Sequence, residues 1–291
     1  MAMRLGEMLL GTMTELRIEP TPKRVRARLG GETVVDTTRA LLVWEPRRVV
    51  PGYAVPVEDI AGELVDAVGS DPTRSQTVPL VTLGAGGPPV IESAGFEVHT
   101  AEGDELTLRV GEALLPGAAF RVADPDLAGY AILDFDAFDE WLEEEEPIGG
   151  HPRDPFHRVD VRLSSRRVRI ELDGEVLAET ARPRVVFETK LLPRCYIPRE
   201  DVRQELLRPS PTRTICAYKG QASYFSAEVG DRTVADVAWT YESPLPDAAD
   251  LTGYVSFYDE RVDHVEVDPG LDPVPRAPES EAVPDRPEPE G

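Results

Sequence analysis

The chain has 291 residues, and 31 Lys plus Arg against 54 Asp plus Glu give a formal charge of −23. A chain this acidic repels phosphate backbones and anionic headgroups, so neither nucleic acid nor a membrane is expected as a partner. The length suits about two domains, and 41% hydrophobic residues suffice for sizeable cores. Two cysteines, Cys195 and Cys216, cannot form a disulfide framework or a four-ligand zinc site.

The two ends of the chain differ in character. The apolar stretch Met8–Met13 follows a single Arg4 and is too short for a secretory signal, and no run approaches the roughly 18 apolar residues of a membrane span. We therefore expect a soluble, cytoplasmic protein with reduced cysteines. Residues 268 to 291 hold seven prolines and a charge of −5 (2 basic, 7 acidic), which predicts a disordered tail over 269–291.

An internal repeat is the most informative pattern in the sequence. Arg24–Glu32 matches Arg167–Glu175 at an offset of 143, and the register continues to Tyr53 and Tyr196. Two further blocks answer each other in the same order: Pro56–Ile60 with Pro198–Val202, and Asp126–Tyr130 with Asp250–Tyr254. Repeats of this kind indicate two copies of one domain. We place them at 14–137 and 159–268, joined by an acidic linker with Pro and Gly at 138–158.

Each copy is predicted to be mainly β. Alternating apolar residues flank Asp173-Gly174, and Gly30-Gly31 takes the same place in the first copy, so both are predicted to be hairpin turns. A short helix is expected after Pro198, with Val202, Leu206 and Leu207 buried, and its counterpart runs from Ile60 to Gly69. Later strands are predicted at Thr212–Tyr218, Ala222–Ala227, Val234–Tyr241 and Gly253–Asp259. The expected fold is thus two tandem small β-rich domains.

Charge distinguishes the middles of the two copies. Arg182 to Lys219 has nine basic and four acidic residues, a net of +5, whereas Arg39 to Gln76 has four and six, a net of −2. Local positive charge on an acidic chain favours a small anion such as a phosphate or a carboxylate over a long polyanion. The alternative is that these arginines are scattered over the domain surface.

The candidate site follows this basic stretch, in Thr212–Ser226. Lys219 is one of three lysines, beside Lys23 and Lys190, and offers a titratable amine and a compact charge. Cys216 and Lys219 are the candidate catalytic residues, although Cys216 as a nucleophile needs a neighbouring base or cation and a lone cysteine in a strand is typically buried core.

Aromatic residues concentrate in the same copy and suggest a pocket wall. Trp239 and Tyr241 alternate in a predicted strand and so share a face, although aromatic residues here also suit the core of a small β domain. The predicted ligand-binding residues are Glu188, Arg194, Tyr196, Thr214, Tyr218, Gly220, Tyr224, Trp239 and Tyr241.

Searches for cofactor and metal motifs give no expected group. The four histidines, His99, His151, His157 and His264, are too dispersed for a metal signature. Gly84–Gly87 lacks the Lys-Ser/Thr ending of a phosphate loop, so a turn is expected there. Asp134 and Asp136 place two carboxylates on one side of a predicted strand, an arrangement that suits magnesium, but no glycine-serine element precedes them.

Four ordered blocks then carry a family resemblance: Pro198–Val202, Thr214–Tyr224, Ala238–Tyr241 with Pro244–Pro246, and Gly253–Tyr258. They resemble the DUF427 family, a domain of unknown function that is sometimes labelled nucleotidyltransferase-like. The match spans about residues 159 to 268, and residues 14 to 137 resemble a diverged copy without the Tyr-Lys-Gly block. This chain has Ala217 where the family usually has proline. The resemblance implies a tent-like or barrel-like β domain and no established activity.

The sequence therefore predicts that the second copy binds a small anionic ligand, with Lys219 and nearby arginines supplying charge, Tyr196 and Tyr218 supplying hydrogen bonds, and Trp239 forming a wall. Two alternatives remain open at this point. One is a non-catalytic protein-interaction module that uses the acidic tail and linker. The other is a nucleotidyltransferase-like enzyme, as the family label suggests.

Overall fold

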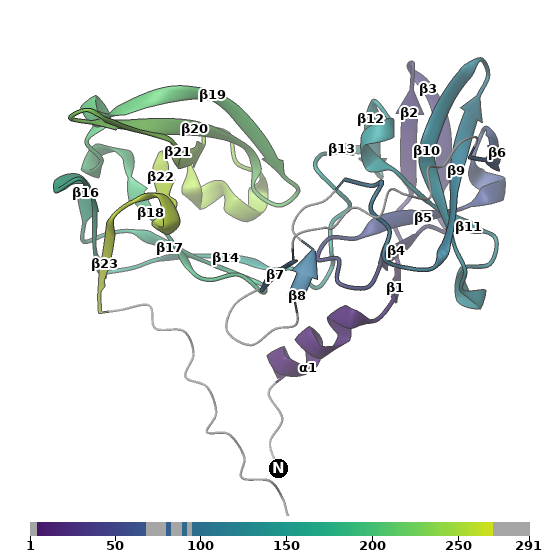
Figure 1. Ribbon diagram of the computed structural model, residues 1–291, viewed down its shortest axis with the longest axis horizontal. Helices are drawn as coiled ribbons and strands as arrows, with labels where there is room; N and C mark the ends of the chain where they lie inside the picture. Colours follow the sequence, from purple (N-terminus) through teal and green to yellow (C-terminus); the bar gives the residue numbers. More distant parts are fainter. Residues whose placement is uncertain (1–4, 68–79, 83–88, 92–94, 270–291) are drawn as a thin grey trace, which may run out of the picture.

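The computed structural model describes residues 5–67, 80–82, 89–91 and 95–269. Two predictions lie outside these ranges, namely the turn at Gly84–Gly87 and nearly all of the tail at 269–291. Within them the chain is mainly β and forms two units side by side (Figure 1), as predicted. No helix in these ranges is long and apolar enough to cross a bilayer.

The first copy consists of a large and a small antiparallel sheet. The large sheet has the order β1 (Arg17–Pro20), β4 (Leu41–Trp44), β5 (Gly52–Pro56), β11 (Tyr130–Leu133), β10 (Ala113–Val122), β9 (Gly103–Val110) and β6 (Glu63–Asp66). The small sheet has the order β13 (Glu146–Ile148), β12 (Glu140–Glu143), β2 (Val25–Leu29) and β3 (Glu32–Thr37). Helix α1 (Leu5–Gly11) and the pair β7 (Leu80–Thr82) and β8 (Pro89–Ile91) belong to the same half of the chain.

The second copy repeats this plan. Its large sheet has the order β14 (Val159–Leu163), β17 (Arg184–Glu188), β18 (Arg194–Pro198), β22 (Tyr254–Phe257), β21 (Arg232–Tyr241), β20 (Gly220–Val229) and β19 (Leu207–Cys216). Its small sheet has the order β16 (Glu175–Thr180), β15 (Arg167–Leu172) and β23 (His264–Asp268). Short 3-10 segments connect the elements of both copies: η1 (Thr12–Thr14), η2 (Val57–Asp59), η3 (Pro125–Leu127), η4 (Phe135–Ala137), η5 (Arg199–Asp201), η6 (Gln204–Leu206), η7 (Pro246–Leu251) and η8 (Asp259–Arg261).

The acidic run after residue 139 is part of the first copy. Strand β12 pairs with β2 as β23 pairs with β15, so these strands close the two small sheets in the same way. Trp141 lies in β12 and is fully buried. The linker predicted over 138–158 is therefore wrong for 140–148, because this segment hides an apolar strand between its glutamates.

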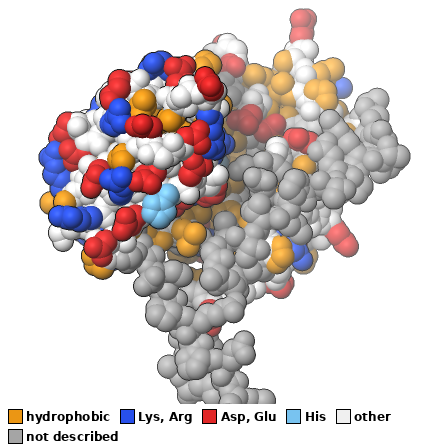
Figure 2. All heavy atoms as spheres, turned by 60° about the vertical axis from the view of Figure 1, so that its left-hand side comes forward, with side chains coloured by type: hydrophobic (Ala, Val, Ile, Leu, Met, Phe, Trp, Pro, Cys, Tyr) orange, Lys and Arg blue, Asp and Glu red, His pale blue; other side chains and the backbone are white. Residues whose placement is uncertain are grey.

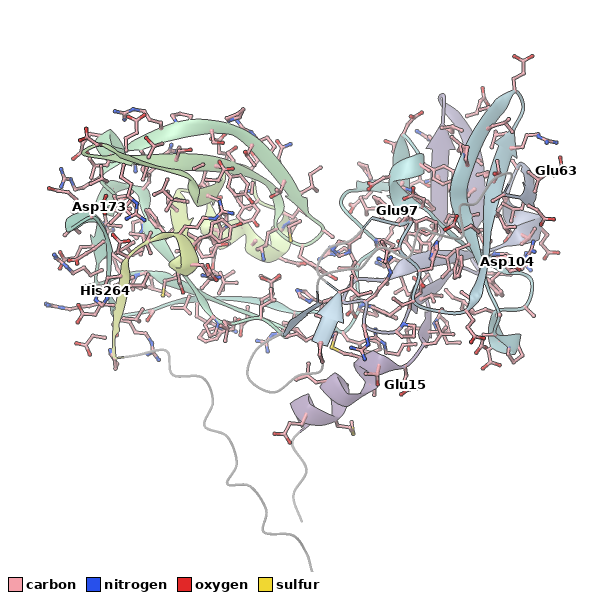
Figure 3. The ribbon with its side chains drawn as sticks, in the orientation of Figure 1. Glu15, Glu63, Glu97, Asp104, Asp173 and His264 are labelled. Atoms are coloured by element: carbon pink, nitrogen blue, oxygen red, sulfur yellow. The ribbon has the colours of Figure 1, made fainter. Side chains whose placement is uncertain are left out.

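The predicted hairpin turns are confirmed. Asp173 and Gly174 have φ of 51° and 77°, and Gly30 and Gly31 have φ of 60° and 83°. Two consecutive positive φ angles match the right-handed twist of the flanking strands. Figure 3 shows Asp173 at the outer end of the second copy, where its backbone N–H donates to Asp263 over 2.6 Å.

The helix expected at 198–207 is instead two 3-10 turns, η5 and η6, each three residues long, and Leu207 already belongs to β19. In the first copy the described part of the helix expected at 60–69 contains strand β6, and turn η2 ends just before it. Isolated bridges join Val202 to Ala178 and Ile60 to Val35, so an extended backbone follows η5 and η2.

The repeat register shifts by one residue in the third strand of each large sheet. Tyr196 pairs with Ser256, and the first-copy residue at this place, opposite Ile132, is Ala54. Tyr53 therefore corresponds to Cys195, and the pairing of Tyr53 with Tyr196 predicted from sequence is wrong. Because a one-residue shift in a strand reverses the face, Tyr53 packs in the core while Tyr196 lies on the opposite side of its sheet.

The large sheet of the second copy has two different faces, since alternate residues of a strand point to opposite sides. One face packs against the small sheet through apolar residues that include Val168, Leu172, Ile197, Phe225 and Val255. The opposite face carries an aromatic cluster of Tyr196, Tyr224, Trp239 and Tyr241. Ala248 and Leu251 of η7 cover part of this cluster. The candidate site lies on this second face.

The same polar contact occurs in both copies and holds the 3-10 turn that follows β18 in the second copy and β5 in the first. The Thr180 hydroxyl donates to Asp201 over 2.6 Å, and Thr37 donates to Asp59 over the same distance. Both threonines are buried. The contact ties the small sheet to the turn that leads out of the large sheet.

We predict that Thr180→Val lowers the free energy of unfolding by about 1 kcal/mol, because valine keeps the shape but leaves Asp201 without this donor. Denaturant unfolding measures the change, and Thr37→Val serves as the matched variant in the first copy. A loss that is not measurable in either variant would contradict a structural role for the contact.

Candidate functional site

A cavity of about 320 Å³ opens on the outer face of the large sheet in the second copy. Its lining is five aromatic, four charged and three aliphatic residues: Tyr196, Tyr224, Trp239, Tyr241 and Tyr258; Glu188, Lys190, Arg194 and Lys219; and Val186, Leu191 and Leu192. The structure thus brings together seven of the eleven residues predicted from sequence: Glu188, Arg194, Tyr196, Lys219, Tyr224, Trp239 and Tyr241.

The aromatic wall is built by strand alternation. Trp239 and Tyr241 share a face of β21, as predicted, and Tyr224 lies opposite Trp239 on β20. The Trp239 indole donates to the Tyr196 hydroxyl over 3.1 Å, and the Tyr258 ring lies 4.4 Å from Trp239 between centroids. These contacts hold the rings in place around an open space.

A buried ionic cluster forms the polar end of the cavity. The Glu188 carboxylate is bonded by Lys219 Nζ on one oxygen and by His157 Nε2 on the other, the latter over 3.0 Å. Only 10% of the Glu188 side chain and 11% of the Lys219 side chain are exposed. Glu188 ends β17, and Lys219 lies in the turn between β19 and β20, so the topology brings them together across 31 residues.

Glu188 is held in its ionised form. Burial opposes its charge, but the hydrogen bonds from His157 and Lys219 and their positive charge outweigh burial and lower the pKa of this carboxyl below its ordinary value. The cluster therefore presents a fixed carboxylate and an ammonium side by side.

The phenols of the wall are neutral hydrogen-bonding groups. Burial raises the pKa values of Tyr196 and Tyr241 well above the ordinary value of a tyrosine. Burial and a hydrogen bond to Tyr224 raise the pKa of Tyr258 to about 12. These three phenols are protonated at neutral pH, so they add polar tips without negative charge.

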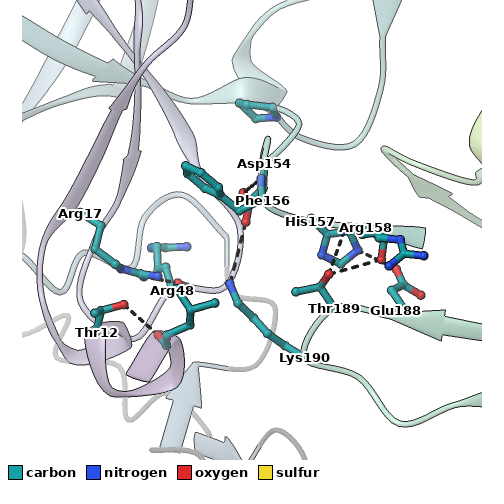
Figure 4. Close-up of polar contacts among 12 residues, drawn as sticks. Thr12, Arg17, Arg48, Asp154, Phe156, His157, Arg158, Glu188, Thr189 and Lys190 are labelled. Carbon is teal, nitrogen blue, oxygen red and sulfur yellow. Dashed lines mark hydrogen bonds and ion pairs between the residues drawn. The ribbon is translucent and has the colours of Figure 1, made fainter. Parts of the chain in front are cut away.

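Two further cations line the rim. Arg194 donates to Glu260 over 2.8 Å and lies 3.0 Å from Asp259. Lys190 lies 3.8 Å from Asp154 (Figure 4), and burial lowers its pKa although the Asp154 charge opposes this effect. Leu191 and Leu192, next to Lys190, are exposed at 47% and 57%, so the mouth of the cavity is partly apolar.

The net charge of +5 between Arg182 and Lys219 does not form a free basic surface. Besides the three cations of the cavity, four arginines pair with carboxylates inside and outside the segment: Arg182 with Glu200 and Asp201, Arg184 with Asp250, Arg203 with Glu175 and Glu205, and Arg208 with Glu228. Arg199 and Arg213 instead bond to Gln204 and to backbone carbonyls. Figure 2 shows basic and acidic side chains interspersed on one face of the second copy. The net charge of the segment predicted a basic surface, but the carboxylates that neutralise it lie outside the segment in the sequence.

The two candidate catalytic residues have different surroundings. Lys219 lines the cavity, whereas Cys216 packs against the aromatic cluster behind the cavity wall and also borders a groove with Glu143, Ile148 and Ala217. The Lys219 ammonium is bonded to Glu188. The structure therefore does not bring Cys216 and Lys219 together as a thiolate and its cation.

The other predicted residues support the site from outside. Thr214 shares a hydrogen bond of 2.9 Å with the Tyr224 hydroxyl. Tyr218 accepts the backbone N–H of Asp154 over 2.7 Å and stacks on His157 at 4.2 Å, so it orders the segment that delivers His157.

Gly220 serves a close backbone approach. Its φ is +93°, and a Cβ there would lie 3.4 Å from the backbone nitrogen of Leu245. That nitrogen donates to the Lys219 carbonyl over 3.1 Å. The glycine thus allows the loop after β21 to dock on the turn that carries Lys219.

Sequence reasoning missed His157, Lys190 and Tyr258. In the sequence, His157 was considered only as a metal ligand. Lys190 was noted only because lysine is rare in this chain, and Tyr258 only as one of the aromatic residues of the second copy. The segment that contains His157 just before β14 has no similar segment before β1 in the first copy. This difference between the copies could have pointed to His157 as a residue specific to the second copy.

Asp134 and Asp136, which were weighed as a magnesium site and set aside, lie at the 3-10 turn η4 and not in a strand. Asp134 caps η4 by accepting the backbone N–H of Asp136 over 3.0 Å. Among residues 5–67, 80–82, 89–91 and 95–269, no group of three or more His, Cys, Asp and Glu side chains is arranged to hold a metal ion.

Comparison with known proteins places this arrangement in a family. A family model described as a domain of unknown function (DUF427) matches residues 17–76 and 160–268. The two segments cover more than half of the chain, which therefore belongs to this family in a two-copy form. No curated protein matches the chain.

We predict that Glu188→Gln destabilises the protein by about 3 kcal/mol at neutral pH, because it leaves Lys219 buried without its carboxylate. Because the folded state lowers the pKa of Glu188, the ionised carboxylate contributes its full stabilisation at pH values above 4.5, the ordinary pKa of this group. This stabilisation is lost as the pH falls through the pKa of Glu188 in the folded state. The stability gap between wild type and Glu188→Gln should therefore narrow below pH 4.5 in denaturant unfolding. Glu32→Gln, at an exposed position, is the control. A gap that stays constant down to pH 3 would contradict this account.

Proposed function

We propose that the second copy of this DUF427 protein binds a small organic anion with a flat apolar part in the cavity beside Lys219. The observation that carries the proposal is the lining itself: five aromatic side chains surround a space of about 320 Å³ whose polar end holds a buried ammonium. Ligand sites are typically concave, mostly apolar and equipped with a few fixed polar groups.

The charge of the lining supports an anion. Lys190, Arg194 and Lys219 face one carboxylate, Glu188, so the lining residues sum to a net of +2 (3 cationic, 1 anionic). Each cation already has an acidic partner, but an ammonium has three donors and a guanidinium five, so donors remain for a ligand. A single carboxylate or phosphate group fits this supply.

Binding is better supported than catalysis. Cys216 is a partly buried side chain packed against the aromatic cluster, which suits a core thiol, and Lys219 is engaged as an ion-pair partner, which suits a role as a fixed charge. The interaction-module alternative used the acidic tail and linker, and the acidic run of that linker lies in strands β12 and β13 and the turn between them. A nucleotidyltransferase-like reaction uses a pair of carboxylates to hold magnesium, and the described lining of the cavity contains one carboxylate, Glu188.

Indole-3-carboxylate is a suitable first probe, with its neutral carboxamide for comparison. We predict that the carboxylate raises Tm and that the carboxamide binds at least about tenfold more weakly, because it lacks the charge that Lys219 attracts. Thermal-shift and calorimetric titrations of the full chain measure both.

Two lysines provide a matched pair of variants. Lys219→Met should abolish the response to the carboxylate, whereas Lys23→Met, which removes a lysine of the first copy, should leave it unchanged. Equal binding to wild type and Lys219→Met, or no response to any aromatic carboxylate, would refute the proposed function.

A further inference from the structure

The first copy has a counterpart of the cavity, and its own chain fills it. Phe120 lies opposite Ile132 as Trp239 lies opposite Ser256, in sheets of the same strand order, so Phe120 corresponds to Trp239. Glu45 follows β4 as Glu188 ends β17, and the two are 143 residues apart, as the repeat requires. The same two landmarks, an aromatic ring and a buried glutamate, are therefore present in both copies.

His99 bridges these landmarks in the first copy. Its Nδ1 lies 3.0 Å from the Glu45 carboxylate, and its ring stacks on Phe120 with a centroid distance of 3.6 Å and an interplanar angle of 5°. Phe96 packs against the ring edge at 4.9 Å. Only 8% of the His99 side chain is exposed, so the imidazole is enclosed.

The second copy leaves the corresponding space open. Trp239 and Glu188 both line the cavity of about 320 Å³, whereas about 120 Å³ remains beside Glu45 in the first copy. Tyr258 packs on Trp239 at a tilt of 43° and forms a neighbouring wall. The segment before β20 supplies Tyr218, whose hydroxyl accepts the Asp154 N–H and whose ring stacks on His157.

We infer that the second copy takes a planar nitrogen heterocycle whose ring N–H donates to Glu188 while its face stacks on Trp239. This inference rests on the proposed function and names the ring class of its ligand. His99 shows in the first copy which group this pair of landmarks accommodates. A carboxylate has about four acceptor positions, and Lys219 and His157 use two, so Glu188 retains capacity for a further donor.

The anionic group of the ligand meets cations in the same cavity. Lys190, Arg194 and Lys219 line it together with Trp239 and Glu188. A ring held by its N–H at Glu188 therefore carries its anionic substituent in a space lined by three cations. The ligand is thus an aromatic N–H heterocycle that carries a carboxylate or phosphate.

The test compares indole-3-carboxylate with benzothiophene-3-carboxylate, which has nearly the same shape and charge but sulfur in place of N–H. Calorimetric titration of the wild-type full chain should show at least about tenfold tighter binding of the indole, because a hydrogen bond to a charged acceptor contributes that much. In Trp239→Leu both should bind weakly, and in Phe156→Ala, a variant at an exposed ring, both should bind as in wild type.

The outcomes separate the two proposals. Equal affinity for indole and benzothiophene, lost in Lys219→Met, would overturn the ring N–H inference and leave the proposed function standing. Binding of neither compound would overturn both. Because the compound pair is compared on the wild-type protein, the result does not depend on the folding of a Glu188 variant.

Discussion

A buried glutamate at the end of the second strand of each large sheet is the constraint on which the two halves of this protein depend. Glu45 and Glu188 are 5% and 10% exposed, and a carboxylate this far from water must be bonded by donors or paired with a cation. Glu45 meets this need with the His99 ring and the backbone N–H groups of Thr100 and Ala101. In both copies burial opposes ionisation and the bonded donors outweigh it, so the pKa is lowered.

The different donors explain why one copy is closed and the other open. In the first copy three donors come from the segment His99–Ala101, beside Arg48 at 3.5 Å, and the His99 ring that bonds Glu45 also stacks on Phe120. In the second copy they come from two places: Lys219 from the hairpin turn and His157 from the segment that joins the copies. Neither side chain covers Trp239, which remains a wall of the cavity. Divergence after duplication has thus kept the acceptor and changed what fills the space beside it.

Local chemistry made part of this structure predictable. The two hairpin turns followed from residues that tolerate positive φ, and the shared face of Trp239 and Tyr241 followed from strand alternation. Features set by distant contacts were not predictable. The one-residue shift that separates Tyr53 from Tyr196 depends on pairing across the sheet, the charge of the basic segment is matched by residues far along the chain, and His157 reaches Glu188 only because Tyr218 and Asp154 order its backbone. Strand β12 was hidden by its glutamates, although Trp141 marked it.

If an aromatic ring and a buried glutamate define a ring-shaped site that His99 fills in the first copy, a free ring should bind there once His99 is removed. A crystal structure of His99→Ala in the presence of imidazole is the decisive measurement, because the variant removes the covalent ring and the probe supplies a free one. We expect imidazole stacked on Phe120 with a ring nitrogen within hydrogen-bonding distance of Glu45. A collapsed, empty space beside Glu45, with Phe96 or water in place of the ring, would contradict it.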